Sequence, residues 1–519
     1  VGEAPPAAHL WLLDIGAAIE DGGASRHGTH ALRRLTGGSD RSVTLFSEAG
    51  LRRAFSFSPD GRHIVFSHAD SALILDTIRS DISIVDTTTG DVRPVVVSDH
   101  WDETPLFSPD GTQILFGRTV VSDWLEDKAL MVVPTTGGQA RRLSIGFTED
   151  VRDTQPLLVD WGVQGIEALF LSGTDRLIYR IEPETGRAAR ISPAELRVQE
   201  ADVSDDGGTL AFVGVEATQA PEVYRLDLAH GGGAERLSHA SGALADWPNH
   251  ASFLVHWMTE DAVRIEGVLY QPEGLSPRAR APLIVVLHGG PRDVAYPARL
   301  HNQMYPIEQW LARGARILFP NYRGSTGYGA SFRQLIVGNT GQAEMQDIAA
   351  AVEHFVATGL ADEQQIGVVG HSWGGYLAAF AAATTDLFAA ISVGSGISDN
   401  RVNYALSIAG VAEEGYLGSL PWAKLELWSA TSPITHVTGE EAPVLILHGV
   451  DDAVVPVANA QLLHKALTDM GAIARLVLFD ETGHDVSRPK EMRAWMQLNL
   501  EWFSQHLWRD ERTDRRGDG

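Results

Sequence analysis

The sequence predicts two domains of different class, an all-β repeat domain followed by a mostly parallel α/β domain. Three observations support this division. A turn signature recurs at a near-constant period in residues 1–245. Apolar strands alternate with helical patterns in residues 246–510. Within that second part, a glycine-flanked serine, Ser372, stands between a strand and a helix.

The composition fits this organisation and excludes several function classes. A chain of 519 residues exceeds one ordinary core, so at least two domains are expected. The net charge of −26 argues against nucleic acid, whose binding depends on cationic contacts to phosphate. No apolar stretch is long enough to span a membrane. The chain has no cysteine, which excludes disulfides, thiolate metal sites and a cysteine nucleophile. We therefore expect a cytoplasmic protein, with a secreted or periplasmic location as the open alternative.

The repeats of the first domain carry a common turn. Phe57-Ser58-Pro59-Asp60-Gly61 recurs as Phe107-Ser108-Pro109-Asp110-Gly111 and, more weakly, as Val203-Ser204-Asp205-Asp206-Gly207. The second copy follows the first by 50 residues and the third follows the second by 96 residues, close to two periods. A degenerate copy is therefore expected over residues 156–170.

Each repeat continues into a second pair of strands. Four short strands at a period in the forties to fifty are typical of a β-propeller blade, with a β-sandwich or β-solenoid as the alternative. Four units are complete and a fragment lies near His9, so the propeller has about five blades and is short or incomplete. Either it closes in an unusual way or N-terminal blades are missing. The second strand pairs span residues 82–95, 130–144, 177–192 and 223–238.

The second domain shows buried strands alternating with helices, which predicts a sheet covered on both faces with its site at the carboxyl ends of the strands. Residues 263–272 form an antiparallel edge, and the charged tail 511–519 is expected to be disordered. Parallel strands are expected at 282–287, 315–320, 366–370, 388–395, 443–449 and 474–479, and helices at 304–313, 345–358, 458–470 and 489–508.

The candidate catalytic residues follow these strands. Ser372 lies in the G-x-S-x-G pattern of a nucleophile elbow, where a strand turns sharply into a helix. A serine hydroxyl needs a base, and the base needs an orienting acid. Asp452 and His484 each follow a buried strand, and the order Ser, Asp, His is that of an α/β-hydrolase. Asp451 is the alternative acid. We expect His448 to support the acid loop and His371 to pack or hydrogen-bond locally.

Two backbone donors are needed for the oxyanion of a tetrahedral intermediate. The N–H of Trp373, directly after the serine, is one candidate. The other is expected in His288-Gly289-Gly290-Pro291, after an early strand, with Gly290 preferred and Gly289 as alternate. The simpler interpretation is that this segment is only a tight turn.

Five motifs together resemble the prolyl oligopeptidase family of serine peptidases, and within it the acylaminoacyl-peptidase-like branch. The resemblance implies a triad of Ser372, Asp452 and His484, and a propeller that restricts access to short, unfolded peptides. It implies no metal and no cofactor, and relatives often form dimers or larger rings. The motifs are HGGP (288–291), NYRGSTGYG (321–329), GHSWGGY (370–376), HGVDDAVVP (448–456) and GHDVSRP (483–489).

Some features depart from that family. Its propellers have more blades, and several relatives place a tyrosine where His288 stands, which favours backbone oxyanion donors here. Dipeptidyl relatives bind a free amino terminus through two propeller glutamates; Glu413-Glu414 lies in the other domain and is not a convincing substitute.

The roles of Tyr322 and Arg323 stay open, and so do three alternative functions. We expect Arg323, after Tyr322, to form a buried ion pair with Asp347, with substrate contact by Tyr322 and Arg323 as the alternative. The other functions are a dipeptidyl aminopeptidase or carboxypeptidase-type member of the family, a carboxylesterase, and an inactive propeller-based binding protein.

Overall fold

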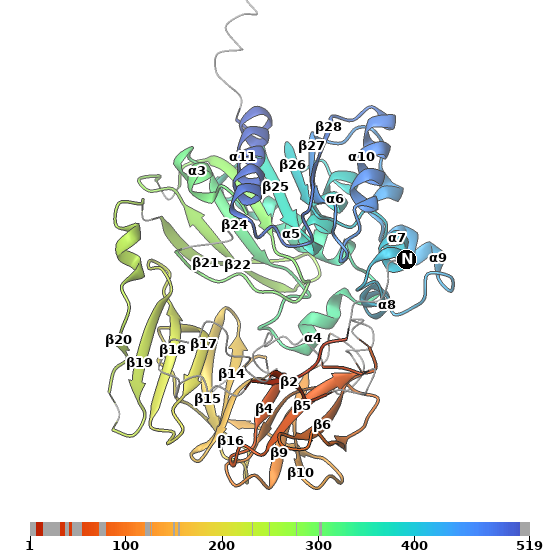
Figure 1. Cartoon of the computed structure of the whole chain (residues 1–519). Coiled ribbons are helices and arrows are strands. Elements are labelled where there is room, and N and C mark those ends of the chain that lie inside the picture. The colour runs from red at the N-terminus through yellow and green to blue at the C-terminus, as the bar shows by residue number, and fades with distance from the viewer. Residues whose placement is uncertain are drawn as a thin grey trace, which may run out of the picture. The chain divides into compact units, whose positions relative to one another are not determined.

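The computed structural model falls into two compact units, drawn in Figure 1. The first contains residues 1–172, 176–214 and 223–237, and the second contains residues 173–175, 215–222 and 238–519. Our domain boundary at residue 245 stays a prediction, and the tail 511–519 lies outside the described residues. Those residues are 7–13, 32–36, 41–43, 54–71, 79–119, 125, 127–148, 151–153, 156–230, 232–248, 250–276, 278–299 and 304–508.

The first unit is built from successive sheets, as the repeats predict, and their strands are antiparallel except for the pair β12–β16. Its described residues form one two-stranded sheet and four sheets of four or five strands. The small sheet pairs β1 (Trp11–Leu13) with β2 (Leu32–Arg34). The next contains β3 (Ser42–Val43), β4 (Phe55–Phe57), β5 (His63–Ala69), β6 (Asp81–Asp86) and β7 (Val92–Val96). These are followed by β8 (Asp102–Phe107), β9 (Gln113–Thr119), β10 (Lys128–Pro134) and β11 (Arg141–Leu143).

The remaining two sheets complete the four full repeats. One contains β12 (Gly146–Phe147), β13 (Leu157–Gly162), β14 (Gly165–Ser172), β15 (Asp175–Ile181) and β16 (Arg187–Arg190). The other contains β17 (Arg197–Val203), β18 (Thr209–Val215), β19 (Glu222–Asp227) and β20 (Glu235–Arg236). The degenerate repeat expected over 156–170 coincides with β13 and most of β14.

Each sheet packs face to face on the next one along the chain. Val65 and Phe116 share a core between the second and third sheets, and Leu130 and Phe170 share one between the third and fourth. This succession of stacked antiparallel sheets is the arrangement of propeller blades. The expected count of four full blades plus a fragment is therefore confirmed for the described residues.

The recurring turns have one common structure. The Ser58 Oγ donates to Asp60 Oδ1 at 2.6 Å and accepts from the amide of His63 at 2.9 Å. The same two bonds recur at Ser108, with 2.7 and 2.9 Å, and at Ser204, with 2.6 and 2.9 Å. The signature therefore marks a turn closed by its own serine and aspartate.

The second unit contains one eight-stranded sheet with the order β21-β22-β24-β23-β25-β26-β27-β28. The first two strands are antiparallel to their neighbours, and the others run parallel. The strands are β21 (Ala251–Met258), β22 (Arg264–Gln271), β23 (Ala281–Leu287), β24 (Arg316–Asn321), β25 (Ala361–His371), β26 (Ala390–Gly394), β27 (Val444–Gly449) and β28 (Ala474–Phe479).

Helices cover both faces of this sheet, as Figure 1 shows. On one face, Trp310 and Phe503 pack on sheet residues such as Ile284 and Leu445. That face carries α3 (Ile307–Ala312) and α11 (Pro489–His506). The other carries α5 (Gln342–Ala357), α6 (Trp373–Thr384) and α10 (Ala458–Met470). Shorter helices connect the strands: α4 (Ala330–Arg333), α7 (Asn400–Leu406), α8 (Val411–Leu417), α9 (Leu425–Ala430), and the 3₁₀ turns η2 (Ala240–Leu244), η3 (Gln334–Ile336) and η4 (Pro433–His436).

Several details differ from the expectation. Helix α5 begins at Gln342 rather than at residue 345, and strand β25 begins at Ala361 rather than at residue 366. Helix α3 starts at Ile307 rather than at residue 304, because Pro306 occupies the N-cap position and ends the preceding loop there. The three short helices between β26 and β27 were not expected. They have only six or seven residues each, too few for a clear hydrophobic period.

Candidate active site

The expected elbow is present at the carboxyl end of β25. Ser372 follows that strand directly, and α6 begins at the next residue. Its backbone has φ 60° and ψ −121°, a conformation that L-residues rarely adopt. The amide of Ser372 donates to the carbonyl of Gly394 at 2.9 Å, and its own carbonyl accepts from Tyr376 at 2.8 Å. These bonds hold the strained serine between strand and helix.

Small residues around the serine are required by close backbone contacts. A Cβ atom on Gly370 would lie 2.1 Å from the carbonyl oxygen of Gly374. A Cβ on Gly374 would lie 2.2 Å from the carbonyl oxygen of Leu287, on the neighbouring strand. Both glycines of the G-x-S-x-G pattern therefore allow backbone to pass at distances that no side chain permits.

The three residues expected to form a triad lie in hydrogen-bond contact. The Oγ of Ser372 and the Nε2 of His484 are 2.8 Å apart. The Nδ1 of the same ring lies 2.8 Å from Oδ2 of Asp452. Because a carboxylate only accepts, Nδ1 carries the proton, and Nε2 is then free to accept from the serine hydroxyl.

Asp452, and not Asp451, faces the histidine. Its side chain is fully buried, and Oδ1 accepts from the amides of Val454 at 2.9 Å and Val455 at 2.8 Å. Burial opposes ionisation, but the bonds from His484 and these amides outweigh it, so the pKa of Asp452 is lowered. Asp451 is exposed.

The two other histidines near the site have the supporting contacts that we expected. His448 donates from Nε2 to the carbonyl of Val455 at 2.7 Å, within the acid loop. His371 donates from Nε2 to the carbonyl of His484 at 3.0 Å, so it holds the backbone that carries the expected base. Burial and the neighbouring His484 lower the pKa of His371 to about 3, so its ring is neutral.

The expected oxyanion donors lie beside the serine. A Cβ on Gly289 would be 3.4 Å from the Cβ of Ser372, so this backbone runs against the nucleophile. Gly290 has φ 116°, which glycine alone adopts readily. Within the described part of the chain, the N–H groups of Gly289, Gly290 and Trp373 donate to no other protein group. All three are therefore available to a bound oxygen, and the choice between Gly289 and Gly290 stays a prediction.

Tyr322 contacts His288, and its role as substrate-site support stays a prediction. It is fully buried, its ring stacks on His288 at a centroid distance of 4.3 Å, and its hydroxyl donates to the carbonyl of His288 at 2.6 Å. Its contact is thus with the loop that precedes Gly289.

The ion pair expected for Arg323 is confirmed. Its Nη2 lies 2.6 Å from Oδ1 of Asp347, and its Nη1 lies 3.0 Å from Oδ2 of Asp261. Although burial opposes the charged guanidinium, these two carboxylates raise the pKa of Arg323. The residue holds the loop after β24.

The sequence analysis missed Glu344, at the start of α5. Its Oε2 accepts from the amide of Gly341 at 2.7 Å, and its Oε1 accepts from the indole of Trp373 at 3.1 Å. Burial raises the pKa of Glu344 to about 8. A signal was available in the sequence, because Glu344 stands three residues after Gly341, which caps the helix. We expected the helix to begin at residue 345, one residue after Glu344, and so left this glutamate out.

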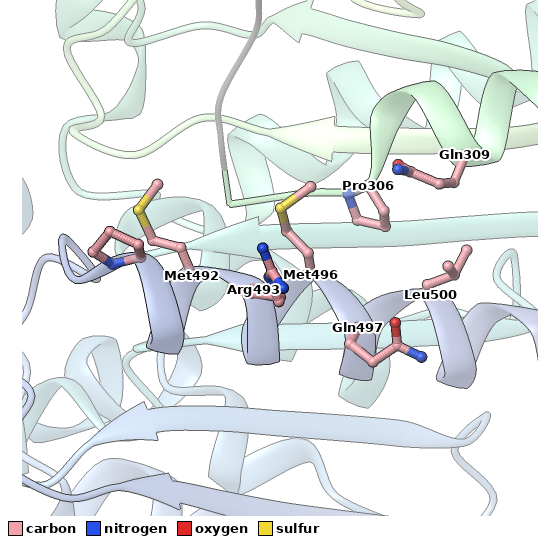
Figure 2. Close-up of a pocket in the computed structure, with 8 residues that line it drawn as sticks. Pro306, Gln309, Met492, Arg493, Met496, Gln497 and Leu500 are labelled. Atoms are coloured by element: carbon pink, nitrogen blue, oxygen red, sulfur yellow. The ribbon is translucent and has the colours of Figure 1, made fainter.

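A separate hollow of about 500 Å³ lies between α3 and α11. In Figure 2, Met496 and Leu500 of α11 point toward Pro306 and Gln309. It is lined by none of the residues expected at the active site. No helix among the described residues combines the length and the hydropathy that crossing a bilayer requires.

The fold and the elbow together define an α/β-hydrolase with a serine at the nucleophile position. A model of the prolyl oligopeptidase family matches residues 303–509. The match lies within the hydrolase domain, which thus resembles the prolyl oligopeptidase family of serine peptidases in sequence as well as in fold.

Individual relatives show the same resemblance. Acylamino-acid-releasing enzyme 1 of Oryza sativa subsp. japonica is 30% identical over 44% of this chain and 30% of its own length. Dipeptidyl-peptidase 5 of Porphyromonas gingivalis is 24% identical over 87% of this chain and 66% of its own length. The chain thus spans less than two thirds of these curated relatives.

A solved structure extends the likeness to both units. The acylaminoacyl peptidase of Pyrococcus horikoshii superposes with a TM-score of 0.73 and 22% identity, over 87% of this chain and 70% of that one. At this identity the likeness concerns the fold, a β-propeller combined with an α/β-hydrolase domain.

Proposed function

We propose that the chain is a serine peptidase that hydrolyses short peptides through an acyl-enzyme, of the acylaminoacyl-peptidase or oligopeptidase type. The observation that carries the proposal is the relay from Asp452 through His484 to Ser372, with both of its hydrogen bonds at 2.8 Å. A serine buried for structural reasons does not need a histidine that is itself oriented by a carboxylate.

In this mechanism His484 Nε2 takes the proton from Ser372 Oγ as the oxygen attacks the peptide carbonyl carbon. Asp452 holds the ring in the productive tautomer and stabilises the imidazolium. The N–H groups of Trp373 and Gly290 stabilise the oxyanion. The tetrahedral intermediate expels the amine, which receives the proton from His484. Water then enters, gives its proton to His484 and releases the acyl group. None of these steps calls for a metal or a cofactor.

Replacement of the nucleophile tests the chemistry. Ser372→Ala should abolish both turnover and labelling by a fluorophosphonate, because the probe reacts with an activated serine. Ser204→Ala is a suitable control, since its hydroxyl bonds only within a turn of the repeat unit, to Asp206 and to the amide of Thr209. Labelling that persists in Ser372→Ala would rule out this serine. Complete inertness of the wild type toward serine probes would favour the inactive binding protein.

The substrate class needs a separate test. The rice relative is named for release of acylamino acids, and the Porphyromonas relative, which aligns over most of this chain, is named a dipeptidyl peptidase. The assay compares an N-acetyl-aminoacyl anilide, a free dipeptidyl anilide and a short acyl ester. Preference for the first supports our proposal, and preference for the second supports a dipeptidyl aminopeptidase. Cleavage of the ester alone identifies an esterase.

We also propose a cytoplasmic location and self-association. The lack of cysteine fits a reducing compartment, where disulfides do not persist. Self-association follows only from the family resemblance. Cell fractionation and light scattering test the two statements separately.

A further inference from the structure

Helix α5 begins with two buried acids that the mechanism above does not use. Glu344 and Asp347 are both 0% exposed. They stand three residues apart, so they project from the same side of the helix. Glu344 is bonded to one proposed donor residue, Trp373, and Asp347 is linked to the other donor segment through Arg323 and Tyr322.

Glu344 holds the residue that follows the nucleophile. Its carboxyl group is fixed on one side by the amide of Gly341, at 2.7 Å, and receives the indole N–H of Trp373 on the other, at 3.1 Å. The indole also contacts the rings of Tyr376 and Tyr416, each at a centroid distance of 4.9 Å and at an interplanar angle of 57° and 60°. The side chain of Trp373 is thus anchored by its indole N–H and by two aromatic contacts, and its backbone N–H is the first proposed donor.

Asp347 holds the other donor segment through two intermediate residues. Its Oδ2 accepts from the backbone amide of Arg323 at 2.7 Å, and its Oδ1 accepts from the guanidinium. This fixes the peptide between Tyr322 and Arg323. The hydroxyl of Tyr322 in turn donates to the carbonyl of His288 at 2.6 Å. That carbonyl belongs to the peptide bond directly before Gly289, where the second donor segment begins.

We propose that Glu344 and Asp347 are positioning residues that set, from one helix, the relative placement of the two oxyanion donors. An oxyanion is stabilised only when its donors stand about 2.7–3.1 Å from the developing charge. One helix that is connected to both donor segments, directly through Glu344 and indirectly from Asp347 through Arg323 and Tyr322, fixes their separation better than two independent loops would. The inference rests on the proposed function, because it assumes that an oxyanion forms beside Ser372.

The competing interpretation is that both acids serve only the stability of the domain. In that case a conservative replacement lowers the unfolding temperature, and the enzyme that remains folded keeps its kcat. The test therefore has to measure the oxyanion interaction itself.

The main variant is Glu344→Gln, which keeps the size of the side chain but replaces one accepting oxygen with an NH₂ group. The matched control is Glu353→Gln, an exposed glutamate on the same helix. We expect kcat to fall about 10- to 100-fold in Glu344→Gln with KM nearly unchanged, because the lost stabilisation concerns the transition state. Glu353→Gln should match the wild type.

An ester and its thionoester analogue provide a readout that a structural role would not change. Sulfur accepts hydrogen bonds weakly, so the thionoester gains little from the donors in any variant. We expect the ratio of ester to thionoester turnover to fall in Glu344→Gln and to stay constant in Glu353→Gln. A constant ratio in Glu344→Gln would overturn the inference.

Two further variants test the two connections separately. The Glu344 arm is the bond from Glu344 to Trp373, and the other arm leads from Asp347 through Arg323 and Tyr322 to His288. Trp373→Phe removes the indole N–H, so its effect and that of Glu344→Gln should not add in the double variant. Additive effects would overturn the Glu344 arm. For the other arm, Asp347→Asn risks misfolding because it weakens the pairing of a buried arginine. Tyr322→Phe, which removes only the hydroxyl that holds His288, should lower the same ratio, and an unchanged ratio would overturn that arm.

Fluorophosphonate labelling separates this inference from the proposed function. Wild-type labelling together with an unchanged turnover ratio in Glu344→Gln overturns only the positioning role. Absence of labelling in the wild type overturns the proposed function and this inference with it.

Discussion

Ser108 in the repeat unit and Ser372 in the hydrolase unit both stand at a turn beside a strand, yet their hydroxyl groups have different partners. Ser108 bonds to Asp110 and to the amide of Gln113, all within five residues. Ser372 bonds to His484, which lies 112 residues away. The first hydroxyl is saturated by its own turn, whereas the second is held by a distant side chain that also accepts protons. The same residue type therefore serves the fold when its partners are local and chemistry when they are not.

The largest expected effect comes from a change in the long-range contacts of Ser372, which lead through His484 to Asp452. Asp452→Asn keeps the shape of the acid but removes the charge that orients His484, so kcat should fall on the order of 10³- to 10⁴-fold. Asp451→Asn is the matched control, because this neighbouring side chain is exposed and the hydrogen bond to His484 comes from Asp452. Initial rates on an aminoacyl anilide measure both. Similar losses in the two variants would contradict the assignment of the acid.

The second effect concerns a buried acid that lacks a full set of partners. Glu413 on α8 accepts from the amide of Asn403 through Oε1, but its buried Oε2 has no hydrogen-bond partner among the described groups. Burial raises its pKa from near 4.5 to about 8. Between these values the folded state keeps a proton that the unfolded state has lost, so stability falls as pH rises.

Glu413→Gln should remove this pH-dependent loss of stability. At about pH 4 the variant and the wild type should have similar free energies of unfolding. At about pH 8 the free energy of unfolding of the variant should exceed that of the wild type by up to about 4 kcal/mol, since each pKa unit corresponds to about 1.4 kcal/mol. Urea unfolding followed by the loss of fluorophosphonate labelling measures the difference for the hydrolase unit. A difference that stays constant with pH would show that the carboxyl is already ionised in the folded protein.

The smallest effect is expected from a change in the local contacts of Ser108 within its turn. Ser108→Ala leaves the amide of Gln113 without its acceptor and should lower the stability of the repeat unit by about 1–2 kcal/mol, with turnover per folded molecule unchanged. Ser204→Ala should have a smaller effect, because that serine is exposed and water replaces the lost bonds. Thermal unfolding of the two variants measures the difference. A large loss of turnover at constant stability would mean that the turn affects the active site.

Local patterns explain what the sequence could predict. The blade turns, the elbow and the strand-end positions of Asp452 and His484 are each encoded within about ten residues, and each has the expected structure. The pair of Arg323 and Asp347 was also foreseen, because both residues follow directly from the strand and helix pattern.

The missed features depend on contacts between segments that are distant in the sequence. Glu344 meets Trp373 only because α5 and α6 pack side by side on the sheet. The bond from Tyr322 to His288 requires β23 and β24 to be neighbours, although a loop and a helix separate them in the chain. No spacing in the sequence marks these pairs. They arise from the order of the strands, which periodicity does not determine.

The crowded glycines of the elbow limit how this protein can be altered. Gly370, Gly374 and Gly375 each face a carbonyl oxygen at 2.1–2.3 Å from where a Cβ would be. Random mutagenesis should therefore find almost no tolerated change in this segment. A directed-evolution library aimed at new selectivity would be better placed in the α7–α9 region, which has exposed side chains such as Trp422, in the connection between α8 and α9, and Leu425, at the start of α9. The geometry that strains the nucleophile thus also separates the invariable part of the enzyme from the part that can be redesigned.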